Sequence, residues 1–267
     1  MTRPALDIIL KNGLLPETQA YVVASGVQNR RCVDQFIRGL KTLRLWDSLI
    51  AAWPLCDSQN VGVGLSAFGL KGAANKTLQN GAAGISCAQA SSQNLTTPGT
   101  SALRLTSQVT LMLVFNAVTP SNFAGFAGAF TKTQGGAAYT HNYQFNTVDS
   151  SRNITFVAGD GVSTASSLNA NISPDTSKHC LIGSCQAGRN TFLKLDTAIA
   201  LSTTNSMTQL GTATDPLNFG RSGTTGTYFT NAEYSFGAVF SNAATSSQID
   251  ALCALYKSTL GDALNLP

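Results

Sequence analysis

The sequence predicts a mainly β protein, an antiparallel two-sheet sandwich with a small N-terminal helical segment and one C-terminal helix. Charged residues make up only 11% of the 267 residues, under half of the roughly 25% that is usual in soluble domains. Glutamate occurs only at Glu17 and Glu233, so the chain lacks the charged outer faces that long solvated helices need. After residue 58, strand-like segments follow one another without the strand–helix alternation of a parallel sheet.

Residues 1–57 form an N-terminal segment that carries most of the helical signals. Pro4 is suited to open a short helix that Gly13 ends. Apolar residues then recur twice at the spacing of one helix face: Val33, Phe36, Ile37 and Leu40, followed by Trp46, Leu49, Ile50 and Trp53. Pro54 would stop the second helix. We therefore predict amphipathic helices over 33–40 and 46–53 and leave residues 16–25 unassigned.

Residues 58–267 form the predicted sandwich domain. Strands are expected at segments of apolar or alternating residues, namely 109–118, 139–146, 154–157, 180–182, 192–195 and 234–240. Segment 109–118 is apolar on both faces, which is typical of a strand in the middle of a sandwich. One helix is expected after the last strand, capped by Thr245 or Ser246 with Gln248 close behind and ending before Gly261.

Motifs near the C-terminus resemble the end of a concanavalin A-like, laminin-G-type jelly roll. They are Pro-Leu-Asn-Phe-Gly at 216–220, Tyr-Phe at 228–229, Phe-Gly-Ala-Val-Phe at 236–240 and Thr-Ser-Ser-Gln-Ile at 245–249. The segment 192–196 resembles an earlier strand that usually ends in Asp-Gly, but Thr197 replaces that glycine, so the turn after Asp196 is atypical. The resemblance covers roughly residues 58–260 and implies a lectin-like jelly-roll sandwich.

A second resemblance concerns residues 36–55, Phe-Ile-Arg-Gly-Leu-Lys-Thr-Leu-Arg-Leu-Trp-Asp-Ser-Leu-Ile-Ala-Ala-Trp-Pro-Leu. This segment is similar to a linker ahead of such jelly rolls in bacteriophage virion proteins, although Leu43-Arg44 replaces a small-Gly pair and Trp53 a tyrosine. It implies a virion structural protein that assembles in the bacterial cytoplasm. Its partners would be other virion proteins and sister subunits, in a homo-oligomer such as a trimer. In a reducing cytosol the six cysteines are expected to remain thiols.

The sequence offers no catalytic set. Glycoside hydrolysis needs two carboxyl groups facing the scissile bond. Glu233 is the only glutamate of the sandwich, no Gly-x-Ser-x-Gly elbow is present, and five aspartates fall in predicted turns, namely Asp149, Asp160, Asp175, Asp196 and Asp215. His179, Cys180 and Cys185 form only a weak metal-like cluster, and no group of aspartates marks a calcium site. We expect no catalytic residues, no metal site and no cofactor, with buried thiols as the simpler interpretation of the cysteines.

Two kinds of binding surface remain open. A strand face bearing Asn142, Gln144 and Asn146, or a loop bearing Tyr228 and Phe229, could hydrogen-bond and stack on sugars, although ordinary solvated sheet surface explains the same residues. The apolar N-terminal segment could dock onto a partner through Leu6, Ile9, Leu10, Trp46 and Trp53. We favour docking for residues 1–31 and contact with the sandwich for Trp46 and Trp53, which directly precede its first strand.

The leading functional interpretation is a non-enzymatic virion protein, either a tail or fibre component or a capsid decoration, whose jelly roll contacts host surface glycans. The alternatives are a carbohydrate-binding module of a bacterial surface protein, which should carry the export signal that we do not recognise here, and a divergent glycoside hydrolase. We expect no nucleic-acid partner, because aspartates dilute the basic cluster at 30–44. The longest apolar run, 109–118, is too short for membrane insertion.

Overall fold

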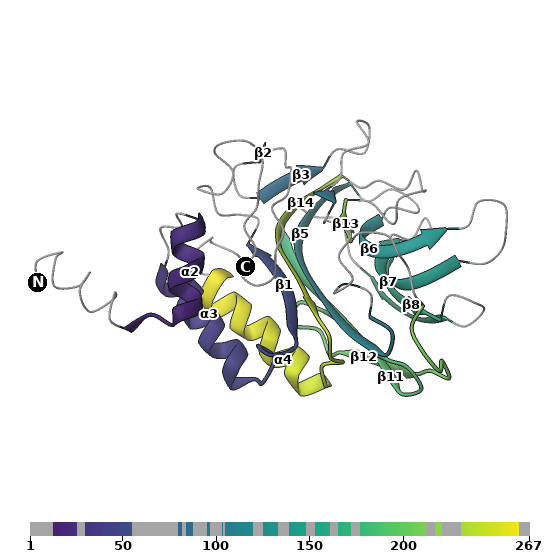
Figure 1. The fold of residues 1–267 in the computed structure, drawn as a ribbon. Coiled ribbons are helices and arrows are strands. Elements are labelled where there is room, and N and C mark those ends of the chain that lie inside the picture. The colour runs from purple at the N-terminus through teal and green to yellow at the C-terminus, as the bar shows by residue number, and fades with distance from the viewer. Residues whose placement is uncertain are drawn as a thin grey trace, which may run out of the picture.

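The chain folds into three layers, with helices on one side, an eight-stranded sheet in the middle and a six-stranded sheet on the other side (Figure 1). In the computed structural model, the described residues are 13–25, 30–54, 80–81, 84–87, 95–96, 103, 105–119, 125–132, 139–147, 153–160, 165–171, 177–211, 217–220 and 231–261. All strand pairs within these ranges are antiparallel. The predicted fold class, a mainly β two-sheet sandwich, is confirmed.

The eight-stranded sheet has the strand order β12-β11-β10-β5-β14-β3-β2, and β1 also pairs with β14. Its strands are β1 (Leu49–Pro54), β2 (Asn80–Gly81), β3 (Gly84–Cys87), β5 (Gln108–Thr119), β10 (Lys178–Gln186), β11 (Asn190–Leu195), β12 (Leu201–Thr204) and β14 (Asn231–Phe240). β1 lies against residues 236–240 of β14 and β3 against residues 232–234. These two strands therefore share one edge of β14 at its two ends.

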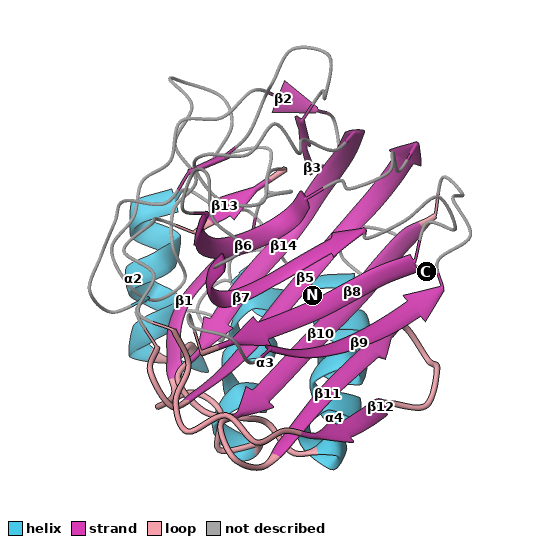
Figure 2. Cartoon of the chain, turned by 90° about the vertical axis from the view of Figure 1, so that its right-hand side faces the viewer, coloured by secondary structure: helices cyan, strands magenta, loops and turns pink. Residues whose placement is uncertain are grey.

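The six-stranded sheet has the order β4-β13-β6-β7-β8-β9 and faces the first sheet (Figure 2). Its strands are β4 (Leu95–Thr96), β6 (Gly125–Lys132), β7 (Tyr139–Thr147), β8 (Asn153–Gly159), β9 (Ala165–Asn171) and β13 (Asn218–Phe219). Tyr143 and Phe145 of β7 are fully buried between the sheets. The predicted apolar face of this strand is therefore confirmed where its side chains are described.

Strand β5 is apolar on both faces because each face contacts a different core. Leu111, Leu113 and Phe115 lie in the cluster between the two sheets. Met112 and Val114 point the opposite way and lie in the cluster between the sheet and the helices. Successive side chains of a strand alternate between faces, so burial of both faces explains why residues 111–115 are all apolar.

In the part of the chain that the structure describes, three helices and a π-helical turn cover the outer face of the eight-stranded sheet: α2 (Pro16–Ser25), α3 (Arg30–Thr42), α4 (Ser246–Tyr256) and η3 (Lys257–Gly261). The predicted amphipathic face of α3 is confirmed, since Val33, Phe36, Ile37 and Leu40 are all buried there. The predicted cap of α4 is also confirmed: Thr245 and Gln248 form a reciprocal capping box. A Cβ at Gly39 would lie 2.2 Å from Leu255 Cδ1, so the glycine permits close packing of α3 on α4.

The predicted helix over 46–53 is wrong, because residues 49–54 form strand β1. This short apolar segment fits both the alternation of a strand and the spacing of one helix face. Pairing with β14 selects the strand. Trp53 is consequently 1% exposed and packs edge to face on Phe219 of the other sheet, with ring centroids 5.7 Å apart. The boundary expected at residue 57 lies outside the described residues.

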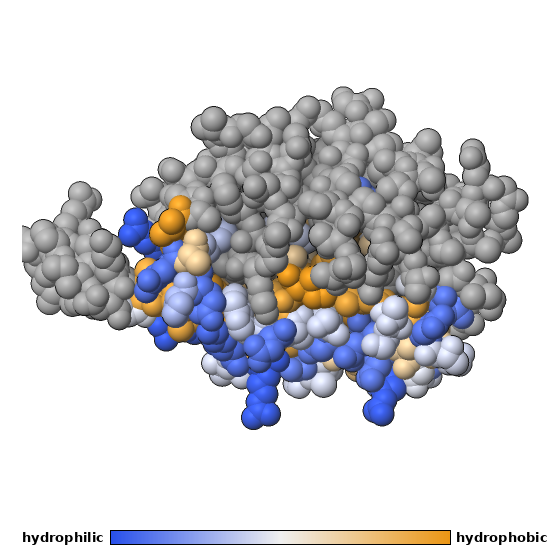
Figure 3. All heavy atoms as spheres, viewed as in Figure 1, coloured by the Kyte–Doolittle hydropathy of each residue, from blue (hydrophilic) through white to orange (hydrophobic). Residues whose placement is uncertain are grey.

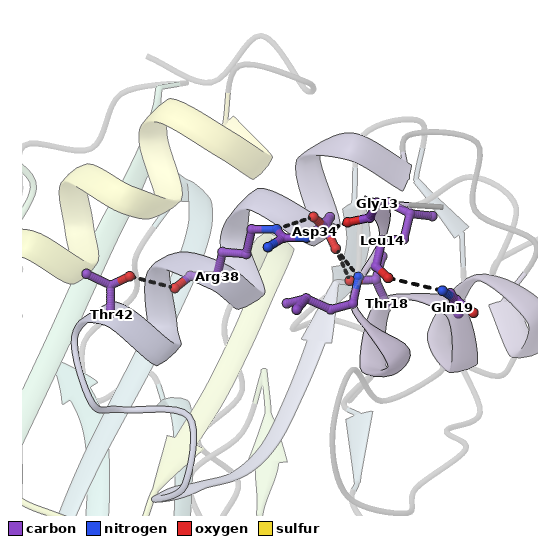
Figure 4. A network of polar contacts seen from close by, with 8 residues as sticks. Gly13, Leu14, Thr18, Gln19, Asp34, Arg38 and Thr42 are labelled. Carbon is purple, nitrogen blue, oxygen red and sulfur yellow. Dashed lines mark hydrogen bonds and ion pairs between the residues drawn. The ribbon is translucent and has the colours of Figure 1, made fainter. Parts of the chain in front are cut away.

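A buried carboxylate joins the N-terminal helices (Figure 4). Asp34 of α3 accepts hydrogen bonds from Leu15 N at 2.7 Å, Thr18 Oγ1 at 2.8 Å and Arg38 Nε at 2.6 Å. Desolvation raises the pKa of Asp34, but the hydrogen bonds from Leu15, Arg38 and Thr18 outweigh it, so the pKa is lowered from 3.8. The ionised form therefore holds the start of α2 against α3.

Replacing this carboxylate should destabilise the protein near neutral pH. We expect Asp34→Ala to lower the free energy of unfolding by about 1–3 kcal/mol, measured by urea denaturation at pH 7. Because the folded pKa is depressed, this stabilisation is present above the unfolded value of 3.8 and is lost as pH falls through the folded pKa. Asp47→Ala, which removes an exposed carboxylate, is the control and should change stability by less than about 0.5 kcal/mol. Equal losses of stability in Asp34→Ala and Asp47→Ala would contradict a stabilising role for the hydrogen bonds of Asp34.

On the face shown in Figure 3, a polar lower edge lies below a band of hydrophobic residues. Figure 3 shows mainly hydrophilic residues along the lower edge of the view, where α3, α4 and β12 lie. The large hydrophobic residues exposed in the described part of the chain are Val23, Ile199 and Leu201. Val23 lies on α2 and the other two near β12, at separate places on the molecule in both ribbon views. Among the described helices, none is long and apolar enough to cross a membrane.

Candidate functional site: a pocket between the C-terminal helix and the sheet

A cavity of about 310 Å³ lies where α4 packs on β5, β10 and β11. It is lined by Val114, Ser177, Lys178, His179, Cys180, Asp196, Thr197, Cys253, Tyr256 and Lys257. Ser177, Thr197 and Lys257 are exposed, whereas Tyr256 is 2% exposed. The cavity therefore leads from the surface into the core between the helices and the sheet.

The position of α4 over this end of the sheet follows from buried polar contacts in the segment before it. Thr110 Oγ1 of β5 donates to Asn242 O at 2.7 Å and accepts from Ala244 N at 2.8 Å. Ser184 Oγ of β10 donates to Ala244 O at 3.0 Å. Two hydroxyl groups of the sheet thus fix the chain immediately before the cap of α4.

The turn after β11 organises the polar wall of the pocket. Asp196 has a left-handed φ of 50°, a conformation that aspartate tolerates better than most residues. Its carboxylate contacts His179 Nδ1 at 2.7 Å through one oxygen and accepts from Cys180 N at 2.7 Å through the other. Asp196 N donates to Cys180 O at 2.8 Å. The atypical turn noted in the sequence therefore places one carboxylate against the start of β10.

Two thiols meet on the helix side of the pocket. Cys180 and Cys253 both pack against the core between the helices and the sheet, and Cys253 Sγ donates to Asp196 O at 3.5 Å. A hydrogen bond from the Cys180 thiol to Cys253 raises the pKa of Cys180 and lowers the pKa of Cys253. The positive charges of Lys194 and Lys257 also lower the pKa of Cys253, against the opposing effects of desolvation and of the Asp196 carboxylate.

Positive charge outweighs negative charge on the pocket wall. Lys178 and Lys257 line it, and Asp196 is its one carboxylate among the described lining residues. Lys194, close by, pairs with Asp250 at 2.7 Å and donates to Ala198 O at 2.6 Å. Two ammonium groups beside hydroxyl and imidazole groups suit a small anionic ligand that also carries hydroxyl groups.

Metal binding receives no support from the described residues, which contain no group of three or more His, Cys, Asp or Glu side chains able to hold an ion. The metal-like spacing of His179, Cys180 and Cys185 does not bring the three together on one face. Cys185 is fully buried between the sheets, where burial raises its pKa to about 11. Cys180 lies on the helix side. Cys32, Cys180, Cys185 and Cys253 are thiols, and Cys56 and the side chain of Cys87 lie outside the description.

The candidate glycan-binding residues that the structure describes are more buried than expected for a surface that contacts sugars. Gln144 on β7 is 3% exposed and faces Gly128 across the strand pair, so its amide is not displayed to solvent. Asn146 is half-buried. No hydrogen-bond partner among the described residues reaches the side-chain oxygen of either amide. The side chain of Asn142, and Tyr228 and Phe229, lie outside the described part, and glycan contact at these positions stays a prediction.

The candidate docking residues also differ in where the structure places them. Trp53 is buried in the sandwich, so its indole contributes to the chain's own core rather than to a docking surface. Trp46 is half-buried against the helix-side core, with Lys41 Nζ 5.7 Å from its ring centroid. Tyr21 of α2 also belongs to that core. Leu6, Ile9 and Leu10 lie outside the described residues, so their docking stays a prediction.

Sequence reasoning missed the pocket because its residues come from distant segments. The residue pair His179-Cys180, the turn Asp196-Thr197 and the helix residues Cys253 and Lys257 meet only when α4 packs on β10 and β11. The local signals were the neighbouring His and Cys and the missing glycine after Asp196. Neither signal indicated that Cys253 would also line the pocket.

Comparison with known proteins shows a shared fold without a shared family. No protein-family model matches the sequence, and no curated protein matches it either. Among solved structures, the binding domain of botulinum neurotoxin serotype G is similar with a TM-score of 0.58 and 10% identity, covering 79% of this chain and 51% of that one. The binding domain of Paraclostridial Mosquitocidal Protein 1 gives 0.54 and 8%, covering 79% and 52%.

A Trypanosoma rangeli sialidase in complex with sialic acid is similar with a TM-score of 0.56 and 9% identity, covering 80% of this chain and 34% of the sialidase. The chain therefore spans about half the length of the toxin binding domains and a third of the sialidase. At these identities the likeness is one of fold, that of a two-sheet β-sandwich.

Proposed function

We propose that this chain is a non-enzymatic, glycan-binding sandwich of a tailed-bacteriophage virion, and that the pocket beside α4 receives an acidic sugar unit. The pocket carries the binding proposal. A volume of about 310 Å³ lies at the lower end of the ~300–1,000 Å³ typical of ligand pockets, which suits one sugar ring. Lys178 and Lys257 supply positive charge for a carboxylate, and Tyr256 and Val114 supply apolar surface for the ring.

One of the neighbouring structures supports the same class of ligand. Two of them are binding domains of toxins, and the sialidase structure contains sialic acid, which is an acidic sugar. The non-enzymatic part of the proposal rests on the pocket wall. Paired-carboxylate hydrolysis requires two carboxyl groups, whereas Asp196 is the one carboxylate among the described lining residues and it is engaged by His179 and by Cys180 N.

The virion part of the proposal rests on the resemblance of residues 36–55 to a phage linker. In the structure this segment runs from α3 through the turn at Arg44 into β1, so it connects the helical layer with the sandwich. Residues 1–31, whose α2 part also packs on α3, would then dock onto another virion protein or a sister subunit in a homo-oligomer. Mass spectrometry of purified particles tests this directly, because a structural component appears there in stoichiometric copies. Absence from the particles would contradict it.

A glycan array that contains sialylated, uronic-acid and neutral glycans tests the binding proposal. We expect acidic glycans to bind preferentially and the double variant Lys178→Ala/Lys257→Ala to lose at least about tenfold in affinity, since two charge-assisted contacts are removed. Arg189→Ala is a matched control, because it removes an exposed cation at the opposite end of β10. Equal binding of acidic and neutral glycans, or equal loss in the control, would overturn the assignment of this pocket.

A further inference from the structure

Cys180 and Cys253 stand apart from the other described cysteines because they line one cavity from two different elements. Cys180 lies near the start of β10 and Cys253 in the last turns of α4. Both line the same cavity and both pack against the same core. Asp196 contacts both residues, because Cys253 Sγ donates to Asp196 O at 3.5 Å and Asp196 N donates to Cys180 O at 2.8 Å. The packing of α4 on the sheet therefore keeps the two cysteines together.

The surroundings of Cys253 favour a nucleophilic sulfur. The Cys180 thiol and the ammonium groups of Lys194 and Lys257 lower its pKa, and together they outweigh the opposing effects of burial and of the Asp196 carboxylate. The thiolate is the reactive form of cysteine, and the cavity beside it gives a small reagent access. Cys180 keeps its proton, because donation to Cys253 and burial raise its pKa.

Cys185 provides the contrast within the same strand. It is fully buried between the sheets, and its Sγ accepts from Thr191 Oγ1 at 3.4 Å. Burial raises its pKa to about 11. A thiol of this kind is inert toward reagents in solution, so reactivity is expected at the pair and not at cysteines generally.

We propose that Cys180 and Cys253 form an oxidisable pair that closes into a disulfide between β10 and α4 when the protein meets a peroxide. The Cys253 thiolate attacks one peroxide oxygen, the O–O bond breaks, and the released hydroxide takes a proton to leave as water, giving a sulfenic acid at Cys253. The Cys180 sulfur then attacks the Cys253 sulfur, the S–O bond breaks, and the Cys180 proton leaves with the hydroxyl group as a second water. Two thiols and one hydrogen peroxide thus yield one disulfide and two waters.

The disulfide would link α4 covalently to β10 at the pocket. A disulfide bond of about 2.05 Å is much shorter than a hydrogen-bonded contact between two sulfur atoms, so its formation draws the helix and the strand together or rotates both side chains. The cross-link closes a long loop from β10 to the last helix, which restricts the unfolded chain. This inference is independent of the proposed glycan binding, since it uses only the two thiols and their neighbours.

The test is oxidation of the full-length protein with hydrogen peroxide, followed by peptide mapping without reductant. We expect a single cross-linked peptide pair containing Cys180 and Cys253, two hydrogens lighter than the sum of its peptides and cleaved by dithiothreitol. The thermal midpoint should rise by about 5 °C or more and return after reduction. Retention of both thiols, or oxidation of Cys253 to a sulfinic acid without any cross-link, would overturn the proposal.

Single-residue variants distinguish the peroxide-attacking role of Cys253 from the resolving role of Cys180. In Cys180→Ser, Cys253 should accumulate as a sulfenic acid that dimedone traps, because the resolving thiol is gone. In Cys253→Ser, Cys180 should remain a thiol at the same peroxide concentration. Cys32→Ser, which alters a half-buried cysteine of α3, is the control and should form the cross-link as the natural chain does. A cross-link that survives in either pair variant would show that other cysteines carry the reaction.

Discussion

Trp53→Ala should be among the most damaging single substitutions in this protein, lowering the free energy of unfolding by about 3–5 kcal/mol. The indole is 1% exposed, lies between the two sheets and packs edge to face on Phe219. Truncation removes this contact and leaves a cavity that surrounding strands can fill only in part. Urea denaturation followed by far-UV circular dichroism measures the change without relying on tryptophan fluorescence.

Trp46→Ala is the matched control for this result. Trp46 is half-buried on the helix side, where its ring contacts the Lys41 side chain at the surface, so its loss should cost about 1 kcal/mol. Trp53→Phe retains an aromatic ring against Phe219 and should recover part of the loss. If Trp53 served a docking surface instead, Trp53→Ala would leave the stability of the isolated protein almost unchanged.

The contrast between α3 and β1 shows what local sequence determines. The apolar spacing of α3 matches only a helix, because its intervening residues include Arg31, Asp34 and Arg38. In residues 49–53 almost every position is apolar, so the spacing fits a helix and a strand equally well. Pairing with β14, whose residues lie nearly 200 positions later, selects the strand. The local pattern of apolar residues contains no information about a partner strand so far along the chain.

The same limit applies to the candidate site. The capping box of α4 and the strands β5, β7 and β14 follow from short-range signals, and each appears where it was expected. The pocket requires α4 to fold back over β10, which is set by the buried contacts of Thr110 and Ser184 with the chain before the helix. These hydroxyl groups carry no signal in the sequence beyond two polar residues in apolar strands.

Close approach of the two sheets makes a second large effect predictable at Gly183. A Cβ at this position of β10 would lie 2.3 Å from Phe156 Cδ2 and 2.5 Å from its Cγ, and Phe156 of β8 is fully buried. The ring has no open space to move into, so Gly183→Ala must push the sheets apart or force the ring off its rotamer. We expect a loss of about 2–3 kcal/mol in the free energy of unfolding, measured by urea denaturation.

A double-mutant cycle identifies the cause of that loss. Phe156→Ala alone should cost about 3–5 kcal/mol by leaving a cavity. In Gly183→Ala/Phe156→Ala the new methyl group enters this cavity instead of meeting a ring, so the combined loss should fall short of the sum of the two single losses by about 1–3 kcal/mol. Additive losses would mean that Gly183→Ala acts through the strand backbone and not through contact between the sheets. Because the two residues lie in different sheets, a positive coupling also reports directly on how β10 and β8 face each other across the core.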